Sequence, residues 1–248
     1  MQEVGKFCSP QCLIHVLKQC MRPFLTVVTL LFLVAACRDV SPSVAGNRAM
    51  LQPGFTGLDL SHHNGRIDWE AFEAAPVDFL YLKATEGTDW KDPRFQDHWR
   101  EAKARGWLVG AYHFYRLCRA GEAQAGNFIQ SVEVRAGGLP PAVDLEYAHN
   151  CEPRGSMSET LAELDVFLER VEAEYGQRPV IYTTPEFHRD WLSDGYADYP
   201  LWLRGLGEVM PRTRDGRAPD IWQYTMSGRV PGIESRVDMN RVPDRPPE

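Results

Sequence analysis

Residues 139–146 read Leu139-Pro140-Pro141-Ala142-Val143-Asp144-Leu145-Glu146, an apolar run that ends in two acids. Its length and composition are those of a short buried strand. Because side chains alternate along a strand, Asp144 and Glu146 lie on one face, whereas Val143 and Leu145 point to the other. A buried strand rarely ends in two acids without partners, so the pair indicates a site rather than a solvated surface.

The chain on both sides of this run repeats one rhythm. Short apolar segments alternate with longer amphipathic ones, which predicts βαβ units and a largely parallel sheet. The expected strands are 55–61, 78–85, 108–115, 142–146, 180–183, 201–203, 221–224 and 237–240. The expected helices are 68–75, 93–105, 121–133, 158–175 and 185–192, with Asp92 and Ser158 at the start of the second and fourth.

Eight strands predict an α/β fold that closes into one TIM-like barrel. The last three strands are joined by segments with little helical pattern, so the barrel is expected to be irregular, of (β/α)5(β)3 type, in a single domain. Its expected bounds are residues 54–243, followed by a tail at 244–248. The chain length of 248 residues also favours one domain over two.

Polar or aromatic residues follow nearly every predicted strand. Parallel barrels place their active sites at the carboxyl ends of the strands, so these residues are expected to converge. The catalytic candidates are Asp59, Asp144, Glu146 and Asp238, and the expected substrate contacts are Glu86, Tyr112, His113, Tyr182, Trp202, Trp222 and Gln223. Crowded acids raise the pKa of at least one of them, as a general acid near neutral pH requires.

Some of these candidates have a second interpretation. The four aromatic residues Tyr112, Tyr182, Trp202 and Trp222 either stack on a ring of the substrate or pack in the core. Glu86 either contacts substrate or forms a structural ion pair with Lys83. The sequence leaves both questions open.

The net charge of −7 and the absence of a dense Lys/Arg run argue against nucleic-acid binding. An uncharged or weakly charged polymer is the more compatible partner. Hydrophobic residues make up 44% of the chain and charged residues 25%, as in ordinary globular proteins. We expect a monomer.

The N-terminal region has the features of an export signal. Residues 1–36 form the expected leader, with the true start at Met21, because a basic start precedes an apolar run too short to span a bilayer. The run ends at Cys37 in a pattern that resembles the lipobox of bacterial lipoproteins, so Cys37 is the expected lipidation site and 37–53 the tether. An ordinary cleaved signal with a coincidental cysteine is the alternative.

These features predict an exported protein, anchored through its N-terminal lipid to a bacterial membrane, with the outer membrane as the expected one, and facing the periplasm or the cell surface. Export would place Cys118 and Cys151 in an oxidising compartment. Their loops leave the same rim if the third and fourth strands are neighbours, which favours a disulfide. Two free thiols are the alternative.

The motifs along residues 54–242 together resemble glycoside hydrolase family 25, the Chalaropsis-type lysozymes. Each motif alone is weak evidence, but so many motifs in the same order are specific for this family. They lie at residues 57–62, 68–69, 78–79, 83–87, 92–95, 110–115, 139–146, 181–183, 199–202, 221–225 and 237–240.

The resemblance implies a flattened barrel and hydrolysis of the β-1,4 bond between N-acetylmuramic acid and N-acetylglucosamine in peptidoglycan. It implies that Glu146 is the general acid/base and that Asp144 stabilises an intermediate formed by the substrate's acetamido group, with retention of configuration. Asp59 and Asp238 would shape the site and tune its charge. The chain departs from the family's usual pattern at 203–207, so the rim of the site is expected to differ there.

Other functions remain compatible with the sequence. One is a peptidoglycan-binding lipoprotein without activity, and another is a glycosidase on a different acetamido-sugar polymer such as chitin. His62, His63 and His113 raise the question of a metal, but no HExxH or paired-histidine spacing accompanies them, and carboxylates suffice for glycoside hydrolysis. We therefore expect no metal and no cofactor.

Overall fold

The computed structural model describes residues 51–133, 138–193 and 195–244. The predicted leader, its start at Met21, the lipidation site Cys37 and most of the tether lie outside these residues. Within them, none of the helices combines the length and the apolar character needed to cross a bilayer.

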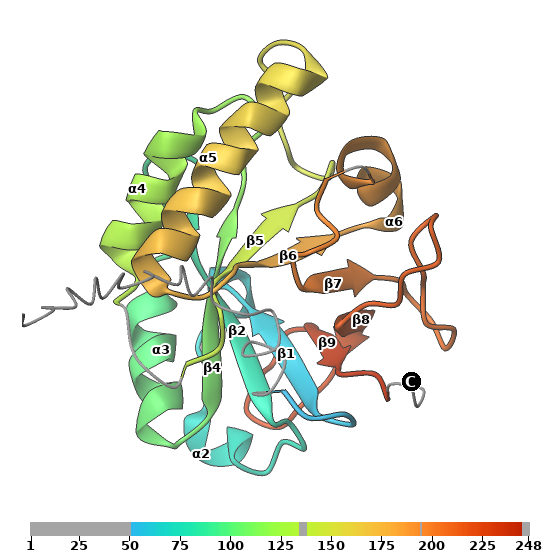
Figure 1. Cartoon of the computed structure of the whole chain (residues 1–248). Helices are drawn as coiled ribbons and strands as arrows, with labels where there is room; N and C mark the ends of the chain where they lie inside the picture. Colours follow the sequence, from blue (N-terminus) through green and yellow to red (C-terminus); the bar gives the residue numbers. More distant parts are fainter. Residues whose placement is uncertain (1–50, 134–137, 194, 245–248) are drawn as a thin grey trace, which may run out of the picture. The chain divides into compact units, whose positions relative to one another are not determined.

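Eight strands form a closed barrel (Figure 1). They follow the order β1-β9-β8-β7-β6-β5-β4-β2 around the barrel, and pairing of β1 with β2 closes it. Their bounds are β1 Thr56–Leu60, β2 Phe79–Glu86, β4 Leu108–Phe114, β5 Ala142–Leu145, β6 Val180–Thr183, β7 Leu201–Arg204, β8 Ile221–Gly228 and β9 Val237–Arg241. The eight predicted strands are therefore confirmed, to within a few residues at their ends.

The barrel is parallel except at its closing strand. From β1 through β2, β4, β5, β6 and β7 to β8, each pair of neighbours is parallel, whereas β9 runs antiparallel to both β1 and β8. The short connection from β8 to β9 contains no crossover helix, and this is why β9 must run back. A ninth strand, β3 at Trp90–Lys91, pairs with the end of β2 and was not predicted because it is only two residues long.

The helices cover the outside of the barrel unevenly. Figure 1 shows α3 (Phe95–Ala104), α4 (Gly121–Ser131) and α5 (Met157–Tyr175) along one side, while β7, β8 and β9 have no long helix beside them. A 3-10 turn at His62–Asn64 follows β1, and α6 at Pro185–Phe187 continues into a π-helical turn at His188–Leu192. This agrees with the predicted irregularity toward the C-terminal end.

Three helix starts or lengths differ from the prediction. The helix predicted at 68–75 is only α2 at Trp69–Phe72, since Pro76 follows closely and cannot continue a helix. Ser156, not Ser158, caps α5 and forms a capping box with Glu159. Asp92 is not the N-cap of α3, because the turn that it begins continues to Phe95: its Oδ1 accepts from Arg94 N, and its Oδ2 is bound by His62.

Two apolar layers hold the barrel. The outer layer packs the barrel against the helices, and the inner one fills the barrel with side chains of β2, β5, β6, β7 and β8. Tyr81 on β2 and Trp202 on β7 come from strands that are not neighbours, yet their rings lie 4.9 Å apart, so their contact crosses the barrel interior. The interior below the strand ends is therefore a packed core.

Glycines make room for the inner aromatic rings. A Cβ on Gly57 would lie 2.4 Å from the Phe79 ring, and one on Gly110 would lie 2.4 Å from the Tyr81 ring. These two positions admit no side chain because large rings of the neighbouring strand lie against the backbone. The filled interior closes the barrel beneath the carboxyl ends of the strands.

Candidate active site

Strand β5 delivers two carboxyl groups to the inside of the barrel. Ala142 belongs to the inner apolar layer, whereas Val143 and Leu145 belong to the outer one. By the same alternation Asp144 and Glu146 face inward, and both are buried, each with 9% of its surface exposed. The predicted placement of this pair agrees with the structure.

A pocket of about 370 Å³ opens at this end of the barrel. Its size is within the range of small-ligand sites. All four predicted catalytic acids line it, as do the predicted contacts Glu86, Tyr112, Tyr182 and Trp202. The other lining residues are Ser61, His63, Asn64, Lys83, Phe114, His149, Arg204, Met226 and Arg236.

Asp59 and Asp238 face each other across the strands that close the barrel. They are direct partners in the antiparallel register of β1 and β9. Asp59 Oδ2 accepts hydrogen bonds from Gln223 Nε2 at 2.9 Å and Asn240 Nδ2 at 2.8 Å. Burial, and then the charge of Asp238, raise the pKa of Asp59 well above 3.8, so the two acids hold a proton between them more readily than free carboxylates.

Two aromatic side chains fix the amides that bind Asp59. Tyr182 donates to Gln223 Oε1 at 2.9 Å, and Trp202 Nε1 donates to Asn240 Oδ1 at 2.7 Å. Each amide oxygen is thus occupied, which leaves its NH2 group to point at Asp59. The polar layer under the pocket is therefore a connected network rather than a set of separate contacts.

Asp144 and Glu146 lie in an environment that favours protonation. Burial is the main cause of the raised pKa of Asp144, followed by the charge of Glu146, while Lys83 acts in the opposite direction. Oδ1 of Asp144 has no hydrogen-bond partner among the residues that the structure describes. Burial also raises the pKa of Glu146 above 4.5, against the opposing effect of Arg204.

Arg204 is the cation in contact with Glu146. It ends β7, and its Nη1 lies 2.8 Å from Glu146 Oε2, with 23% and 12% of the two side chains exposed. This Glu146 oxygen receives no well-directed hydrogen bond in the described part of the chain. The contact therefore combines an attraction between charges with a hydrogen bond of poor direction.

A bulge in β2 turns Glu86 toward the pocket. The pairing of β2 with β4 shifts between Lys83 and Thr85, so one extra residue enters β2. Thr85 then faces outward, where it bonds His113, and Glu86 regains the inner face. Glu86 Oε2 lies 2.8 Å from Lys83 Nζ, so the ion-pair interpretation holds for a residue that also lines the pocket.

Two predicted substrate contacts do not reach the pocket. His113 is fully buried on the outer face of β4, where it stacks on Phe167 of α5 and bonds Gln124 of α4. Trp222 also faces outward and donates to Gly205 O. Both predictions are corrected for one reason: each residue lies one position away from an inward neighbour, and alternation sends it to the opposite face.

Gln223, by contrast, faces inward but lies behind the pocket wall. It is 1% exposed and contacts Asp59 and Tyr182, so it positions a pocket residue rather than lining the pocket.

Several residues that line the pocket or lie behind its wall were not predicted. Arg204 falls in the segment 203–207 that departs from the family pattern, but the sequence does not show that it reaches Glu146. Asn240 shares the inner face of β9 with Asp238, so alternation alone was a usable signal for it. His149 lines the pocket with φ of 60°, an unusual value for a residue other than glycine, and no sequence signal indicates this.

Cys118 and Cys151 form a disulfide beside the pocket rim. Their Cα atoms are 5.8 Å apart, and the bridge joins the loops that follow β4 and β5. Asn150 adds to the same link, since its side chain accepts from Leu117 N and donates to Tyr115 O. The loops that follow the two central strands are thus tied together.

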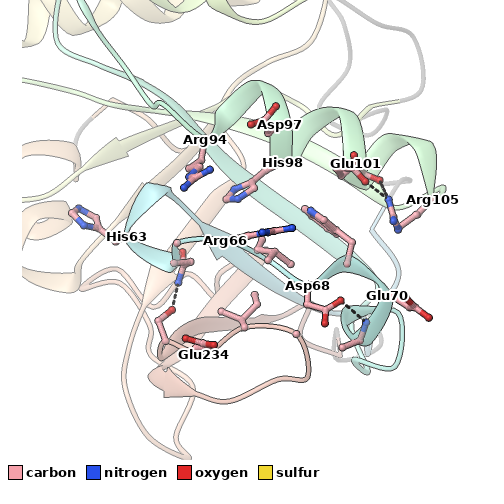
Figure 2. A pocket seen from close by; sticks show the side chains of 18 of the residues that line it. His63, Arg66, Asp68, Glu70, Arg94, Asp97, His98, Glu101, Arg105 and Glu234 are labelled. Atoms are coloured by element: carbon pink, nitrogen blue, oxygen red, sulfur yellow. Dashed lines mark hydrogen bonds and ion pairs between the residues drawn. The ribbon is translucent and has the colours of Figure 1, made fainter.

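A larger hollow of about 1500 Å³ adjoins this pocket and shares His63 and Asn64 with it. Figure 2 shows its charged side chains spread from His63 at one end to Arg105 at the other. Many of these charges compensate each other, as in the pairs of Asp97 with Arg100 and Glu101 with Arg105. The smaller pocket holds the buried acids Asp144 and Glu146, so it is the chemically competent one.

No group of three or more His, Cys, Asp or Glu side chains in the described ranges is arranged to hold a metal ion. The chemistry that the pocket offers is that of its carboxyl groups. Two neighbouring acids on one strand suit this chemistry, because the one that holds a proton can donate it while the other, ionised, stabilises positive charge.

Comparison with known proteins identifies relatives of this chain. The family model described as "Glycosyl hydrolases family 25" matches residues 58–233. Lysozyme M1 of Streptomyces globisporus is 34% identical over 207 residues, covering 76% of this chain and 67% of that protein. The N,O-diacetylmuramidase of Chalaropsis sp is 30% identical over 201 residues, covering 73% and 95%.

The fold has the same relatives. The crystal structure of a bacterial lysozyme from Streptomyces coelicolor superposes with a TM-score of 0.70 at 32% identity, and the alignment covers 77% of this chain and 93% of that one.

Proposed function

The chain belongs to the glycosyl hydrolases of family 25 and is a glycoside hydrolase, and we propose that it cleaves the β-1,4 bond between N-acetylmuramic acid and N-acetylglucosamine in peptidoglycan. The observation that carries this proposal is the buried pair Asp144 and Glu146 at the pocket. Both have raised pKa values, and Glu146 comes after the end of β5, nearer to the mouth of the pocket than Asp144. The acid nearer to solvent is the one suited to exchange protons with substrate and water.

In the proposed reaction Glu146 gives a proton to the glycosidic oxygen as the bond to C1 breaks. The acetamido oxygen of the muramyl residue attacks C1 and forms a cyclic cation. Asp144 accepts the acetamido N–H and stabilises the positive charge. Water then attacks C1 and loses a proton to Glu146, which opens the ring and regenerates the acid. Two inversions give net retention, by substrate assistance rather than a protein nucleophile.

Asp59 and Asp238 act behind this pair. They lie in the same pocket, and Asp59 is held by the amides of Gln223 and Asn240. We assign to them the placement of the sugar and the tuning of the charge around Asp144, since the charge of Asp59 is one cause of the raised pKa of Asp144.

The aromatic residues divide between two roles. Trp202 is 2% exposed and Tyr182 6%, so they form the pocket floor and hold polar groups in place more than they cover a sugar ring. Tyr112 is less buried and lines the pocket, which makes it the best placed of the three to contact a sugar face.

Export and lipid anchoring through Cys37 complete the proposed function. Support comes from the sequence of residues 21–37, where a basic start, an apolar run and a lipobox-like end occur in order. A peptidoglycan hydrolase needs access to the wall, and an anchor would hold the enzyme beside it. Mass spectrometry of the N-terminal peptide from cells tests this: an acylated Cys37 supports the anchor, and a free or absent Cys37 contradicts it.

Digestion of purified peptidoglycan tests the activity. We expect the protein to release fragments whose new reducing end is N-acetylmuramic acid, and we expect Glu146→Gln to lower the rate about 10²- to 10⁴-fold. N-acetylglucosamine at the reducing end would assign another bond. Binding without products would favour a non-catalytic wall-binding protein, and hydrolysis of chitin alone would favour the other polymer.

A further inference from the structure

Arg204 lies where substrate must bind, in contact with the proposed acid. Both Arg204 and Glu146 line the pocket, and the contact of 2.8 Å joins Nη1 to Oε2. Arg204 comes from the end of β7, whereas Glu146 follows β5, so their contact bridges the pocket across the intervening strand β6.

This contact opposes the role proposed for Glu146. A general acid must carry a proton before the reaction, whereas a guanidinium at ion-pair distance favours the charged carboxylate. Arg204 and then His149 are the two groups that lower the pKa of Glu146 against the effect of burial. An enzyme in which Arg204 never left Glu146 would hold its acid in the less useful form.

The contact is also one that a ligand can replace. Glu146 Oε2 receives no well-directed hydrogen bond, so little hydrogen-bond energy is lost when Arg204 exchanges Glu146 for a ligand. A guanidinium offers five N–H donors in a planar fork, which fits a second carboxylate in bidentate fashion. Arg204 is also among the groups that lower the pKa of Asp144 and Asp238, so its charge acts on three acids of the pocket and is not committed to Glu146 alone.

The proposed substrate carries a suitable group. A muramyl residue bears a lactyl branch that ends in a carboxylate, or in a peptide stem with carboxylates of its own, whereas N-acetylglucosamine bears none. Resting on the function proposed above, we propose that Arg204 leaves Glu146 and binds a carboxylate of the muramyl branch when substrate enters. This makes Arg204 the residue that selects a muramyl sugar over a glucosaminyl sugar beside the acid.

Binding measurements test the selection. In the Glu146→Gln protein, calorimetry would compare three ligands: stem-free muramyl oligosaccharide, stem-bearing oligosaccharide and chito-oligosaccharide of equal length. We expect Arg204→Gln to weaken binding of at least one muramyl ligand about 10- to 100-fold, as for a lost hydrogen bond to a charged group, and to change chito-oligosaccharide binding less than about 3-fold. The larger loss identifies the lactyl group or the stem as the source of the carboxylate.

The pH dependence of the active protein tests the release. The basic limb of kcat/KM reports the acid in the free enzyme and that of kcat reports it in the complex. We expect the limb of kcat to lie at higher pH than that of kcat/KM, and the two to converge in Arg204→Gln as the limb of kcat/KM moves upward. Arg204→Lys should keep part of the separation, because it keeps the charge.

Arg214→Ala is the matched control, since it removes an exposed arginine that does not line the pocket. It should leave both measurements unchanged. Equal losses for all three ligands, no loss for either muramyl ligand, or coincident limbs in the unaltered protein would overturn the proposal. Failure of the proposed function has a different result: digestion of peptidoglycan or chitin yields no new reducing ends, whatever affinities calorimetry gives.

Discussion

Burial sets the chemistry of each carboxyl group in the pocket. Asp59 and Asp144 have raised pKa values chiefly because water is excluded from them, and neighbouring acids add to the effect. Such groups stabilise the reaction and destabilise the fold at the same time. A raised pKa means that the folded protein holds its proton more tightly than the unfolded chain does.

Replacing Asp144 by asparagine should therefore stabilise the protein while it damages catalysis. Below about pH 4 the carboxyl is protonated in both states, so the change has little effect. As the pH rises, the unfolded chain loses this proton first, and the unaltered fold becomes less stable relative to it. We expect Asp144→Asn to gain on the order of 1 kcal/mol at pH 7.5 in urea unfolding and to lose about 10²- to 10³-fold in kcat.

Asp97→Asn provides the comparison for this experiment. Asp97 is an exposed acid on α3 whose contact with Arg100 lies at the surface, so its replacement should change stability by less than about 0.5 kcal/mol. A gain for Asp144→Asn that is as large at pH 4 as at pH 7.5 would refute the proton-linked explanation.

Among the elements, β2 and β4 depend on a missing side chain. Gly110 of β4 lies against Tyr81, whose ring is fully buried and whose hydroxyl donates to Pro140 O. A methyl group here would meet the ring at 2.4 Å and Leu139 Cβ at 3.0 Å. Neither neighbour has space to yield, because the Tyr81 ring also packs on Trp202.

Gly110→Ala should accordingly destabilise the fold by about 1–3 kcal/mol, as overpacking of a core does. Thermal unfolding followed by circular dichroism would measure it. Gly126→Ala on α4 is the control, since a Cβ there meets no atom within 4 Å and alanine favours helix. If both variants unfold at the same temperature, the close approach in the barrel has no energetic weight.

The disulfide joins the elements that carry the acids. It closes a segment of 33 residues that contains α4 and most of the path from β4 to β5. By the loop-closure model such a bridge contributes about 3–4 kcal/mol. We expect the free energy of unfolding, measured in guanidinium, to fall by that amount in the double variant Cys118→Ser and Cys151→Ser. Reductant should lower the unfolding midpoint of the unaltered protein only. Coincident transitions would contradict this.

The sequence predicted the positions of the strands better than the side of each strand on which a given residue lies. Periodicity located all eight barrel strands, and the alternation of 142–146 placed Asp144 and Glu146 correctly, because both features depend on local burial. It failed for His113 and Trp222, since a polar or aromatic residue near a strand end is as compatible with the outer layer as with the inner one. It also could not predict the bulge that returns Glu86 to the pocket, or the contact of Arg204 with Glu146, which depend on register between distant strands.

For the molecule as a whole, closure depends on β9. It is the strand that pairs with both β1 and β8, and it brings Asp238 and Asn240 to Asp59. Without it, two strand edges would be open to pairing with other chains. The acids of the pocket are thus contributed by segments from almost the whole length of the barrel.

A chain that ends at Ser235 should consequently lose its cooperative thermal transition and associate in solution. Light scattering and calorimetry would show both effects. Arg241→Ala, which changes an exposed residue of β9 that stacks on Trp222, should keep the transition. A monomeric truncated protein with an intact transition would show that the remaining strands close without β9.

Because β9 is the last strand in the sequence, its position also determines when the active site can form. A ribosome completes β1 long before it makes β9, and a chain that crosses a membrane from its N-terminus delivers the two strands in the same sequence. Until the last strand arrives, Asp59 lacks Asp238 and Asn240, and the barrel has no closed wall around Glu146. A hydrolase built in this way acquires its cutting site only when its last strand is in place.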